Sequence, residues 1–474
     1  MRIVQTFWTG GQDPLKYGFG WPHAEYNLMS WALSCLSLLK HYDEVVLYTD
    51  SAGKRILIDE LHLPYTDVQV VFDDAEWLPQ HWALAKIKTY SLQTKPFLHV
   101  DGDIYVPRPL PEEILSAPLI AQNREIGTIY YRRMMDRILS YPEILIPEYI
   151  QKALSEESIP SYNMGFFGGS DLAFIRHYCD EAFRFMEENR MNDPSARCSR
   201  VTCNIFFEQI LFTALVDKEN REVASVLGKV MTDKGYMLHE FCDLAHFDAH
   251  PFHHLLGGHK RKREVNEALA EALMRESPDM LWKIISLFPD HHVRLAKESV
   301  YTADLSVERC IGQYEDFLRE AERRWIGLPV DELFATEQRI SACKLLANPE
   351  SRIPDDAGLE ANPYMACFDI PLSWPQRTKT VLNERFGRAG NTVFSHILVI
   401  ATLWMNGYRE VPTGNLERRM VSLLEGKSLS FHELQEQFIS SFKQENETMR
   451  EGFKKLSLQL IKQLIKERII LMKK

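Results

Sequence analysis

The sequence lacks the features that mark several special classes of protein. No run of about 20 apolar residues occurs, so no transmembrane segment is expected. The N-terminus has no basic start followed by a long apolar run, so no signal peptide is expected either. Internal repeats and low-complexity tracts are also absent. Together these absences predict a folded, cytoplasmic protein.

Cysteine pairs with metal-ligand spacing are missing. None of the eight cysteines forms a CxxC pair, and Cys198 and Cys203 are five residues apart. No zinc knuckle is therefore expected. Most of the cysteines have apolar neighbours, which predicts buried thiols in a reducing compartment.

Basic residues are fewer than acidic residues in this chain. The chain has 55 Lys and Arg against 66 Asp and Glu, which gives a net charge of -11. An acidic protein of this kind is not expected to bind nucleic acid, although a local basic pocket for a phosphate is compatible with it. The basic run from His259 to Arg263 is accordingly interpreted as one active-site lysine, Lys260, with solvated neighbours.

The chain contains ample apolar material for more than one core. Its 474 residues are 45% hydrophobic, and a chain of this length predicts two or three domains. Strand and helix patterns alternate over residues 1–265, which predicts an α/β domain with a mainly parallel sheet and helices on both faces. Ala245–Phe247 is the last short strand expected in it. A helical region is expected at 266–350. Residues 351–474 are expected to form an all-helical or winged-helix-like domain, in which Ser430-Phe431-His432-Glu433 is a capping-box pattern at the start of a helix.

Two carboxylates follow a predicted buried strand. Phe97–Val100 is apolar and leads directly into Asp101-Gly102-Asp103. Ligands of open α/β sheets bind beyond the carboxyl ends of the strands, and two carboxylates placed there can hold a hard divalent cation. Gly102 is expected to let an ion or a sugar approach closely. The alternative is an ordinary turn, because Asp-Gly-Asp is also common turn chemistry.

Four segments together resemble a known family. Asp101-Gly102-Asp103 resembles the DxD motif of GT-A glycosyltransferases, and the segment from His254 to Lys260 fits the HxxGxxK pattern of glycogenin-like members. Asn163-Met164-Gly165 resembles the strand of that family that faces the sugar. Glu208-Gln209 resembles its acidic-Gln pair near the reacting carbon, which is more often Asp-Gln. The resemblance covers about residues 1–265.

The resemblance implies a GT-A (Rossmann-like) fold and a hexosyltransferase. The donor would be a nucleotide sugar, most simply a UDP-sugar, and the cofactor Mn²⁺ or Mg²⁺. The resemblance also implies a retaining reaction. The acceptor, whether a glycan, a peptide or protein, or a small molecule, is left open.

The residues of the second motif have their own chemistry. His254 can offer a neutral imidazole as a third metal ligand beside Asp101 and Asp103. Gly257 lets the backbone approach a diphosphate, and Lys260 supplies a mobile charge for a phosphate oxygen. The alternative is a His-rich loop without any ligand.

Several other residues are candidates for binding the nucleotide sugar. Thr6 and Trp8 end the first predicted strand, where Trp8 would stack on the base or belong to the core. Asp50 ends the second and would contact uracil or ribose, or cap the following helix. Lys86 would point towards the diphosphate or be solvated. By resemblance, Asn163 and Gly165 would face the sugar.

Glu208 and Gln209 are the candidate catalytic residues. In a retaining enzyme a polar group on the reacting face of the sugar would stabilise an oxocarbenium-like transition state. In an inverting enzyme Glu208 would act as the base on the acceptor hydroxyl. A helical salt bridge is the structural alternative for Glu208.

Three functions are compatible with these patterns. The first is metal-dependent transfer of a hexose from a UDP-sugar. The second is nucleotidyl transfer, for which Thr9-Gly10-Gly11-Gln12 is a faint version of a phosphate-binding loop. The third is nucleotide binding without turnover.

Overall fold

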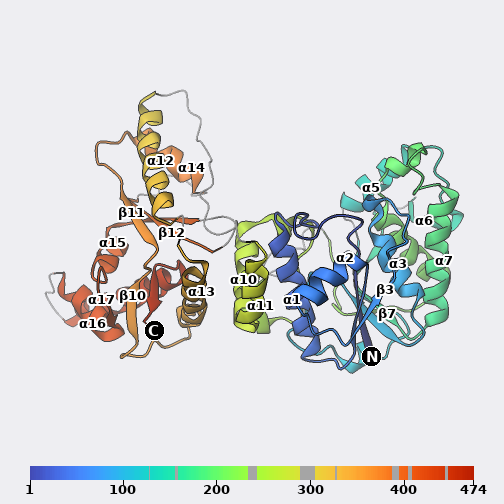
Figure 1. The fold of residues 1–474 in the computed structure, drawn as a ribbon, viewed down its shortest axis with the longest axis horizontal. Coiled ribbons are helices and arrows are strands. Elements are labelled where there is room, and N and C mark those ends of the chain that lie inside the picture. Colours follow the sequence, from blue (N-terminus) through green and yellow to red (C-terminus); the bar gives the residue numbers. More distant parts are fainter. Residues whose placement is uncertain are drawn as a thin grey trace. The chain divides into compact units, whose positions relative to one another are not determined.

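The protein forms two compact units, Met1–Ile284 and Ile285–Lys474 (Figure 1). The structure is a computed structural model. It describes residues 1–126, 129–154, 158–232, 243–288, 305–325, 328–386, 394–403, 408–442 and 447–473. Each unit has its own hydrophobic core. Cys242, one of the eight cysteines, lies outside the described residues.

A seven-stranded sheet forms the centre of the first unit. The strand order is β3-β2-β1-β4-β7-β6-β8. β7 runs antiparallel to its neighbours β4 and β6, and the remaining pairs are parallel. The strands are β1 (Arg2–Phe7), β2 (Val45–Thr49), β3 (Asp67–Val70), β4 (Phe97–Val100), β6 (Ile120–Glu125), β7 (Ser161–Gly169) and β8 (Ala224–Ser225). The predicted α/β class with a mainly parallel sheet is confirmed.

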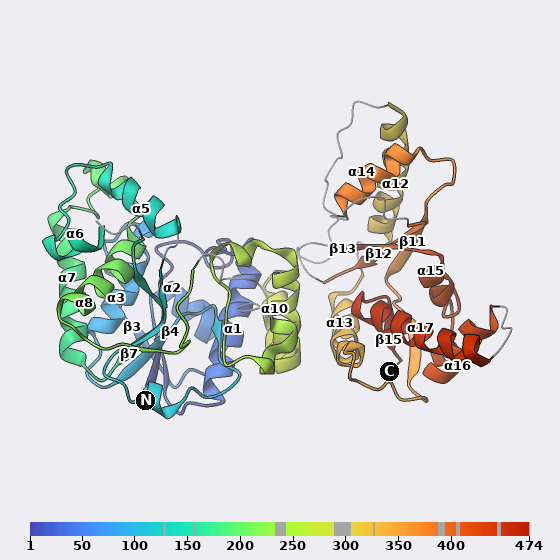
Figure 2. The same ribbon diagram turned by 180° about the vertical axis from the view of Figure 1, so that it is seen from behind.

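Helices cover both faces of this sheet. In Figures 1 and 2, α1 (Ala24–Leu39) and α10 (Arg263–Glu276) lie on one side, and α3 (Ala83–Ser91) and α7 (Leu172–Glu188) lie on the other. The central strands are largely buried because both of their faces are covered. Every residue of β2 and β4, for example, is buried. Shared burial between sheet and helices therefore holds the carboxyl ends of the strands in place.

Shorter elements connect these layers. They are α2 (Ser51–Lys54), α4 (Glu112–Leu115), α5 (Ile129–Leu139), α6 (Glu148–Leu154), α8 (Leu211–Lys218), the π-helical turns η1 (Arg55–Glu60) and η4 (Phe206–Ile210), and the 3-10 turns η2 (Pro79–His81), η3 (Arg197–Arg200), η5 (Leu244–Ala249) and η6 (Gly257–Arg261). β5 (Ile104–Tyr105) and β9 (His253–His254) form a separate two-stranded sheet.

The strand predicted at Ala245–Phe247 is wrong. That segment forms η5, where Asp243 accepts hydrogen bonds from the backbone and the imidazole of His246 and so favours a turn.

The unit boundary lies beyond residue 265. α10 packs on α1, and Lys40 of α1 forms an ion pair with Glu276 of α10 at 2.5 Å. α10 therefore belongs to the first unit, and α11 (Pro278–Ser286) extends to its end. The region 266–350, which was predicted to be one helical segment, is consequently divided between the two units. No described helix is both long and apolar enough to cross a membrane.

The second unit is mixed α/β. It contains two three-stranded sheets, in the orders β14-β10-β15 and β11-β12-β13. The elements are α12 (Leu305–Trp325), α13 (Val330–Lys344), β10 (Gly358–Ala361), β11 (Met365–Asp369), α14 (Gln376–Arg385), β12 (His396–Ala401), β13 (Tyr408–Thr413), α15 (Asn415–Ser422), β14 (Leu429–Ser430), α16 (Phe431–Ser440), α17 (Glu447–Lys466) and β15 (Ile470–Met472), with the 3-10 turn η8 (Leu345–Ala347). The predicted all-helical alternative for residues 351–474 is wrong.

The strands of the second unit pair over long distances in sequence, which explains the error. β10 pairs with β15 more than 100 residues later, and β12 lies between β11 and β13 as a buried centre. A short apolar run such as His396–Ala401 has no periodicity that distinguishes a strand from a buried helix. The capping box predicted at Ser430 is confirmed, because Ser430 and Glu433 exchange side-chain to backbone hydrogen bonds.

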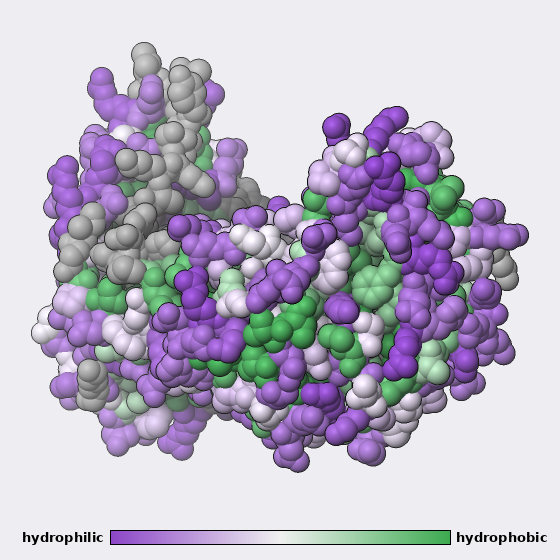
Figure 3. Space-filling model, turned by 45° about the vertical axis from the view of Figure 1, so that its right-hand side comes forward, coloured by the Kyte–Doolittle hydropathy of each residue, from purple (hydrophilic) through white to green (hydrophobic). Residues whose placement is uncertain are grey.

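One face of the molecule shows how polar and apolar residues are distributed over the described surface (Figure 3). On the face drawn in Figure 3, hydrophilic residues cover most of the described area and apolar residues form separate patches among them. This agrees with the charged fraction of 26% in the sequence.

A buried ion pair in the second unit gives a test of the fold. Arg468, which precedes β15, pairs with Glu337 of α13, and their side chains are 0% and 4% exposed. Replacing Glu337 by a neutral residue removes the charge that pairs with the buried Arg468 guanidinium. We expect Glu337→Gln to lower the free energy of unfolding of this unit by about 3–5 kcal/mol, measured by urea denaturation. Asp316→Asn removes an exposed partner of Arg319 and serves as the control, with a change under about 1 kcal/mol. Equal effects of the two substitutions would contradict the packing described.

Candidate metal and nucleotide-sugar site

The turn after β4 carries two carboxylates. The Asp101 amide donates to the Gly165 carbonyl of β7 at 2.9 Å, and the Ile104 amide donates to the Asp101 carbonyl at 3.1 Å. These bonds close a tight turn between β4 and β5. The turn interpretation and the metal interpretation are therefore compatible, since the turn sets the directions of both side chains.

Strand pairing brings His254 to this turn from about 150 residues later in the chain. In the β5–β9 sheet Ile104 lies opposite His254, and the Leu255 amide donates to the Asp103 carbonyl at 3.1 Å. His254 Nε2 then lies 3.6 Å from Asp103 Oδ1. One ligand atom from each of Asp101, Asp103 and His254 lies within 4.8 Å of the others. The structure thus brings together the three residues predicted to bind the metal.

Gln122 orients the imidazole of His254. His254 Nδ1 lies 2.6 Å from Gln122 Oε1, which can only accept, so Nδ1 carries the proton and the lone pair of Nε2 faces Asp103. Gly165 leaves space for this pair: a Cβ at residue 165 would lie 2.5 Å from Gln122 Oε1 and 2.6 Å from His254 Cε1. Gly165 therefore makes room for Gln122 and His254, whereas its predicted position facing a sugar stays a prediction.

The donor set suits Mn²⁺ better than Mg²⁺. Carboxylate oxygens suit both ions, but Mg²⁺ strongly prefers all-oxygen octahedral ligands, whereas an imidazole is acceptable to Mn²⁺. Burial lowers the pKa of His254 to about 4, so the ring is neutral and able to bind a metal near pH 7. The residues present fit the ion that was predicted.

Lys260 enters the same cluster. Its Nζ lies 2.6 Å from Asp103 Oδ2 and 5.6 Å from the centre of the Trp21 ring. Gly257, three residues earlier, has a φ of +44°, a conformation that favours glycine, and it starts η6, which carries Lys260. Lys260 thus points at the metal ligands rather than into solvent.

Lys86 is buried between two carboxylates. It lies 2.9 Å from Asp101 Oδ1, forms an ion pair with Glu208, and donates to the Met164 carbonyl at 3.3 Å. The alternative of a solvated lysine is wrong. Because all three N–H donors have acceptors, Lys86 acts here as the counter-ion of Asp101 and Glu208.

The carboxylates of the cluster differ in their proton affinity. Burial raises the pKa of Asp101 to about 7, against the opposing charge of Lys86. Burial acts in the same direction on Asp103, but Lys260 and His254 outweigh it and lower the pKa of Asp103. For Lys86, burial favours the neutral amine, and the charges of Asp101 and Glu208 together raise its pKa. Three carboxylates face two lysines, so the cluster has an excess of negative charge that a cation would balance.

The candidate catalytic residues lie on a π-helical turn, η4. Glu208 is 1% exposed and its carboxylate pairs with Lys86, so the predicted salt bridge exists, but with a site residue rather than along a helix. Gln209 contacts the Tyr131 hydroxyl at 2.8 Å, and that hydroxyl donates to Glu125 at 2.5 Å. π-Helical turns often occur at functional sites because they displace side chains from the regular helical positions.

Asn163 belongs to the same hydrogen-bond network as Gln209. Its Nδ2 donates to Glu125 Oε1 at 2.9 Å, and its Oδ1 accepts from the Gly165 amide at 3.0 Å. Glu125 therefore connects Asn163, on β7, with Tyr131 and Gln209. These four polar residues therefore form one buried hydrogen-bond network.

Two residues at the strand ends have structural partners. Asp50 accepts from the amide and hydroxyl of Thr9 through one oxygen and from the Gly53 amide through the other. Asp50 is therefore the N-cap of α2, as the alternative interpretation predicted. Through Thr9, Asp50 also fixes the loop after β1. Thr6 donates to Thr89 at 2.8 Å and lies 3.0 Å from His99 Nε2, on the α3 side of the sheet.

Trp8 follows β1 and packs against the hydrophobic core of the first unit, as the alternative interpretation predicted. It is half-buried and makes an edge contact with Trp77 at 5.6 Å between ring centres. Its indole also lies beside Gly10, whose φ is +57°. The stacking of a base on Trp8 stays a prediction.

The expected role of Gly102 is wrong. A Cβ at this position would lie 2.5 Å from the indole of Trp31 in α1, so the glycine makes room for Trp31 rather than for an ion or a sugar. The other histidines of the His-rich loop also have different roles. His253 Nε2 donates to the Phe247 carbonyl (2.8 Å) and its ring stacks on that of Phe247, and His246 bonds to Asp243.

Sequence reasoning missed Gln122, Glu125, Tyr131 and Trp21. Gln122 and Glu125 lie on β6 next to β7, which carries Asn163 and Gly165. The run of polar residues from Gln122 to Glu125, directly after apolar Leu119–Ala121, was the available signal, because buried polar groups need partners. Tyr131 and Trp21 lie in segments without any such pattern.

The crowding at Gly165 predicts an effect on metal affinity. Gly165→Ala should displace the Gln122–His254 pair and weaken Mn²⁺ binding by about 10–100-fold, the usual effect of disturbing the partner of a metal ligand. Isothermal titration calorimetry measures it. Gly228→Ala is the matched control, because a Cβ at residue 228 meets nothing within 4 Å. Equal Mn²⁺ affinity in the two variants would contradict this role of Gly165.

The raised pKa of Asp101 predicts a pH dependence. Protons compete with the metal for Asp101 below about pH 7, whereas His254, with a pKa of about 4, is neutral over this range. The Mn²⁺ association constant should therefore rise by up to about tenfold per pH unit between pH 5 and 7 and level off above it. Titrations in buffers of different ionisation enthalpy should show one proton released per ion at low pH. An affinity that stays constant from pH 5 to 8 would refute the assignment.

The comparison with known proteins gives a family but no activity. No curated protein matches the chain. Residues 1–287 match the family of unknown function DUF6734, and this match ends within three residues of the first unit's last residue, Ile284. Since the match covers more than half of the 474 residues, the chain belongs to the DUF6734 family.

Proposed function

We propose that the protein is a metal-dependent glycosyltransferase of the GT-A type. It would move a hexose from a UDP-sugar to an acceptor, with Mn²⁺ as the cofactor. The observation that carries this proposal is the convergence of Asp101, Asp103 and His254 within 4.8 Å, with Lys260 beside them. Carboxylates, an imidazole and a mobile lysine in one place are the groups that a metal diphosphate requires.

The position of the cluster in the sheet supports the proposal. The chain passes from β1 to β2 and β3 on one side and returns to β4 on the other side of β1. Such a reversal of strand order is where open α/β sheets bind nucleotides, beyond the carboxyl ends of the strands. Trp8 follows β1 and Asp101 follows β4 at this place.

Each of these residues would have a distinct role in binding a nucleotide sugar. Asp101, Asp103 and His254 would bind Mn²⁺, which neutralises the charge of the departing diphosphate when bound. Lys260 would exchange its contact with Asp103 for a phosphate oxygen, and Gly257 would present its backbone there. Trp8 would hold the base. Lys86 keeps Asp101 and Glu208 in position.

The hydrogen-bond network of Glu125, Tyr131, Asn163 and Gln209 would lie next to the sugar. An uncharged amide such as that of Gln209 can stabilise the positive charge that develops at the anomeric carbon. Glu208 is paired with buried Lys86 and is 1% exposed, so it is poorly placed to take a proton from an acceptor. This placement favours the retaining reaction over the inverting one.

Activity measurements on carboxylate variants test the proposal. The purified chain should release UDP from a UDP-hexose in the presence of Mn²⁺ and stop when a chelator is added. Asp103→Asn should lower the rate by about 100-fold or more, since it removes charge from the metal site while preserving shape. Asp43→Asn, an exposed acid outside the site, is the control. Full activity of Asp103→Asn would overturn the proposal.

The same assay separates the two competing functions. A nucleotidyltransferase would release pyrophosphate from UTP and a sugar phosphate, without release of UDP. A non-catalytic protein would be stabilised thermally by a UDP-sugar and Mn²⁺ but release no product at any enzyme concentration.

A further inference from the structure

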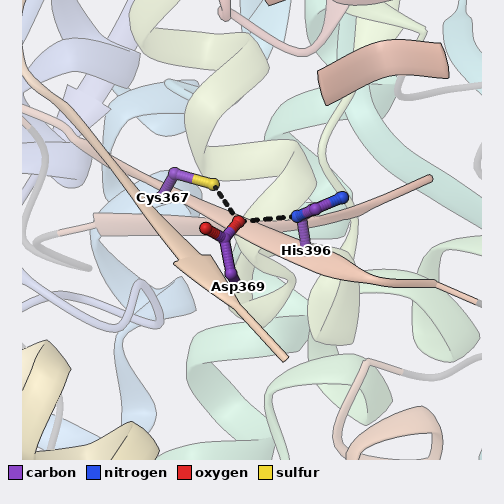
Figure 4. A group of neighbouring side chains, drawn as sticks. All are labelled: Cys367, Asp369 and His396. Atoms are coloured by element: carbon purple, nitrogen blue, oxygen red, sulfur yellow. Dashed lines mark hydrogen bonds and ion pairs between the residues drawn. The ribbon is translucent and has the colours of Figure 1, made fainter. Parts of the chain in front are cut away.

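A second group of metal-ligating side chains lies in the second unit, on the sheet β11-β12-β13. Cys367 and Asp369 occupy alternate positions of β11, so their side chains point to the same face. His396 lies on β12 directly opposite Asp369 in the strand register. One ligand atom from each of the three lies within 4.8 Å of the others. Figure 4 shows the thiol and the imidazole on either side of the carboxylate.

The contacts among the three side chains converge on one oxygen. Asp369 Oδ1 lies 2.7 Å from His396 Nδ1 and 3.4 Å from Cys367 Sγ. Cys367 and His396 are partly buried, whereas the Asp369 side chain is 68% exposed. A sulfur, a nitrogen and an oxygen therefore lie together on a rigid pair of strands, with access from solvent at the carboxylate.

The far side of His396 is also occupied. Nε2 lies 3.1 Å from Asn415 Oδ1, at the start of α15. With Oδ1 facing the ring, Nε2 carries a proton, and Nδ1 then holds either a second proton or a metal ion. An amide or carbonyl behind the ring is the usual arrangement for a metal-binding histidine, because it fixes the tautomer and the ring orientation.

A catalytic cysteine is a poorer explanation of the same group. An activated thiol needs a base at the sulfur. The recorded partner of Cys367 Sγ is the Asp369 carboxylate, and His396 directs its nitrogens to Asp369 and Asn415. The geometry is that of three ligands around a point rather than of a nucleophile and its base.

We propose that Cys367, Asp369 and His396 bind a divalent transition-metal ion of the zinc type. Zn²⁺ accepts thiolate, imidazole and carboxylate ligands together, and three protein ligands leave one tetrahedral position for water or another ligand. Binding deprotonates the thiol and connects β11 to β12. This proposal is independent of the sugar-transfer proposal, whose ligands include no sulfur.

Arg418 is a positive charge close to the proposed metal site. Its Nε lies 3.9 Å from Asp369 Oδ1, and its guanidinium also pairs with Glu425 at 2.5 Å. Glu425 thus offsets the positive charge that would otherwise compete with a cation for Asp369. The thiolate and the carboxylate remain as the charges that a divalent ion neutralises.

Cobalt substitution tests the proposal on the full chain. The protein is treated with a chelator and titrated with Co²⁺, which replaces Zn²⁺ and gives a sulfur-to-metal charge-transfer band only when a thiolate is bound. We expect the band to saturate at one ion per chain and to disappear when Zn²⁺ is added. Cys367→Ser should abolish it, whereas Cys310→Ser, which removes another partly buried cysteine of this unit, should keep it.

Two further variants make the outcome decisive. Asp101→Asn/Asp103→Asn should keep the band, which separates this site from the one in the first unit. His396→Gln retains every cysteine and should weaken Co²⁺ binding by about tenfold or more, so it gives a result even if Cys367→Ser does not fold. Absence of the band in the wild-type chain, its persistence in Cys367→Ser, or unchanged Co²⁺ affinity in His396→Gln would overturn the proposal.

Discussion

The pairing of two very short strands, β5 and β9, is the constraint on which the candidate site depends. β5 follows the Asp-Gly-Asp turn directly, and its register places Ile104 opposite His254. Without these few backbone hydrogen bonds only side-chain contacts, such as that of His254 with Gln122, would hold the imidazole near Asp101 and Asp103, because η5 and η6 flank β9 as short turns. The pairing therefore converts two distant segments into one ligand set.

Charge balance is the second requirement of the site. Buried carboxylates are costly in a protein interior unless cations or hydrogen bonds accompany them. Lys86 forms ion pairs with Asp101 and Glu208, and Lys260 forms an ion pair with Asp103. The arrangement keeps the carboxylates close together, and it leaves an excess of negative charge for a cation. In the proposed function Lys260, which is carried on the turn η6, is the member that moves to the substrate.

Much of the first unit was predictable, because its signals are local. Apolar runs that end in polar residues predicted β1, β2 and β4, and the Asp-Gly-Asp turn marked the site at the end of β4. The remainder depends on contacts between distant segments. The role of Gly165 beside Gln122 and His254, the contact of Gly102 with Trp31, and the network around Glu125 follow from packing that no local spacing encodes.

The second unit shows the same limit more strongly. Cys367, Asp369 and His396 have no motif spacing, because strand pairing rather than a loop brings them together. A search for CxxC pairs could not find them. The strands themselves were missed for a related reason: β10 finds its partner β15 more than 100 residues away, whereas the capping box at Ser430 is a local signal and was predictable.

The central claim is that His254 shares one metal ion with Asp101 and Asp103. Pulsed electron paramagnetic resonance of Mn²⁺ bound to protein labelled with ¹⁵N-histidine tests it most directly. We predict a hyperfine coupling to one imidazole nitrogen that is lost in His254→Gln and retained in His253→Gln. Mn²⁺ binding without any histidine coupling, or a coupling that survives in His254→Gln, would contradict the account.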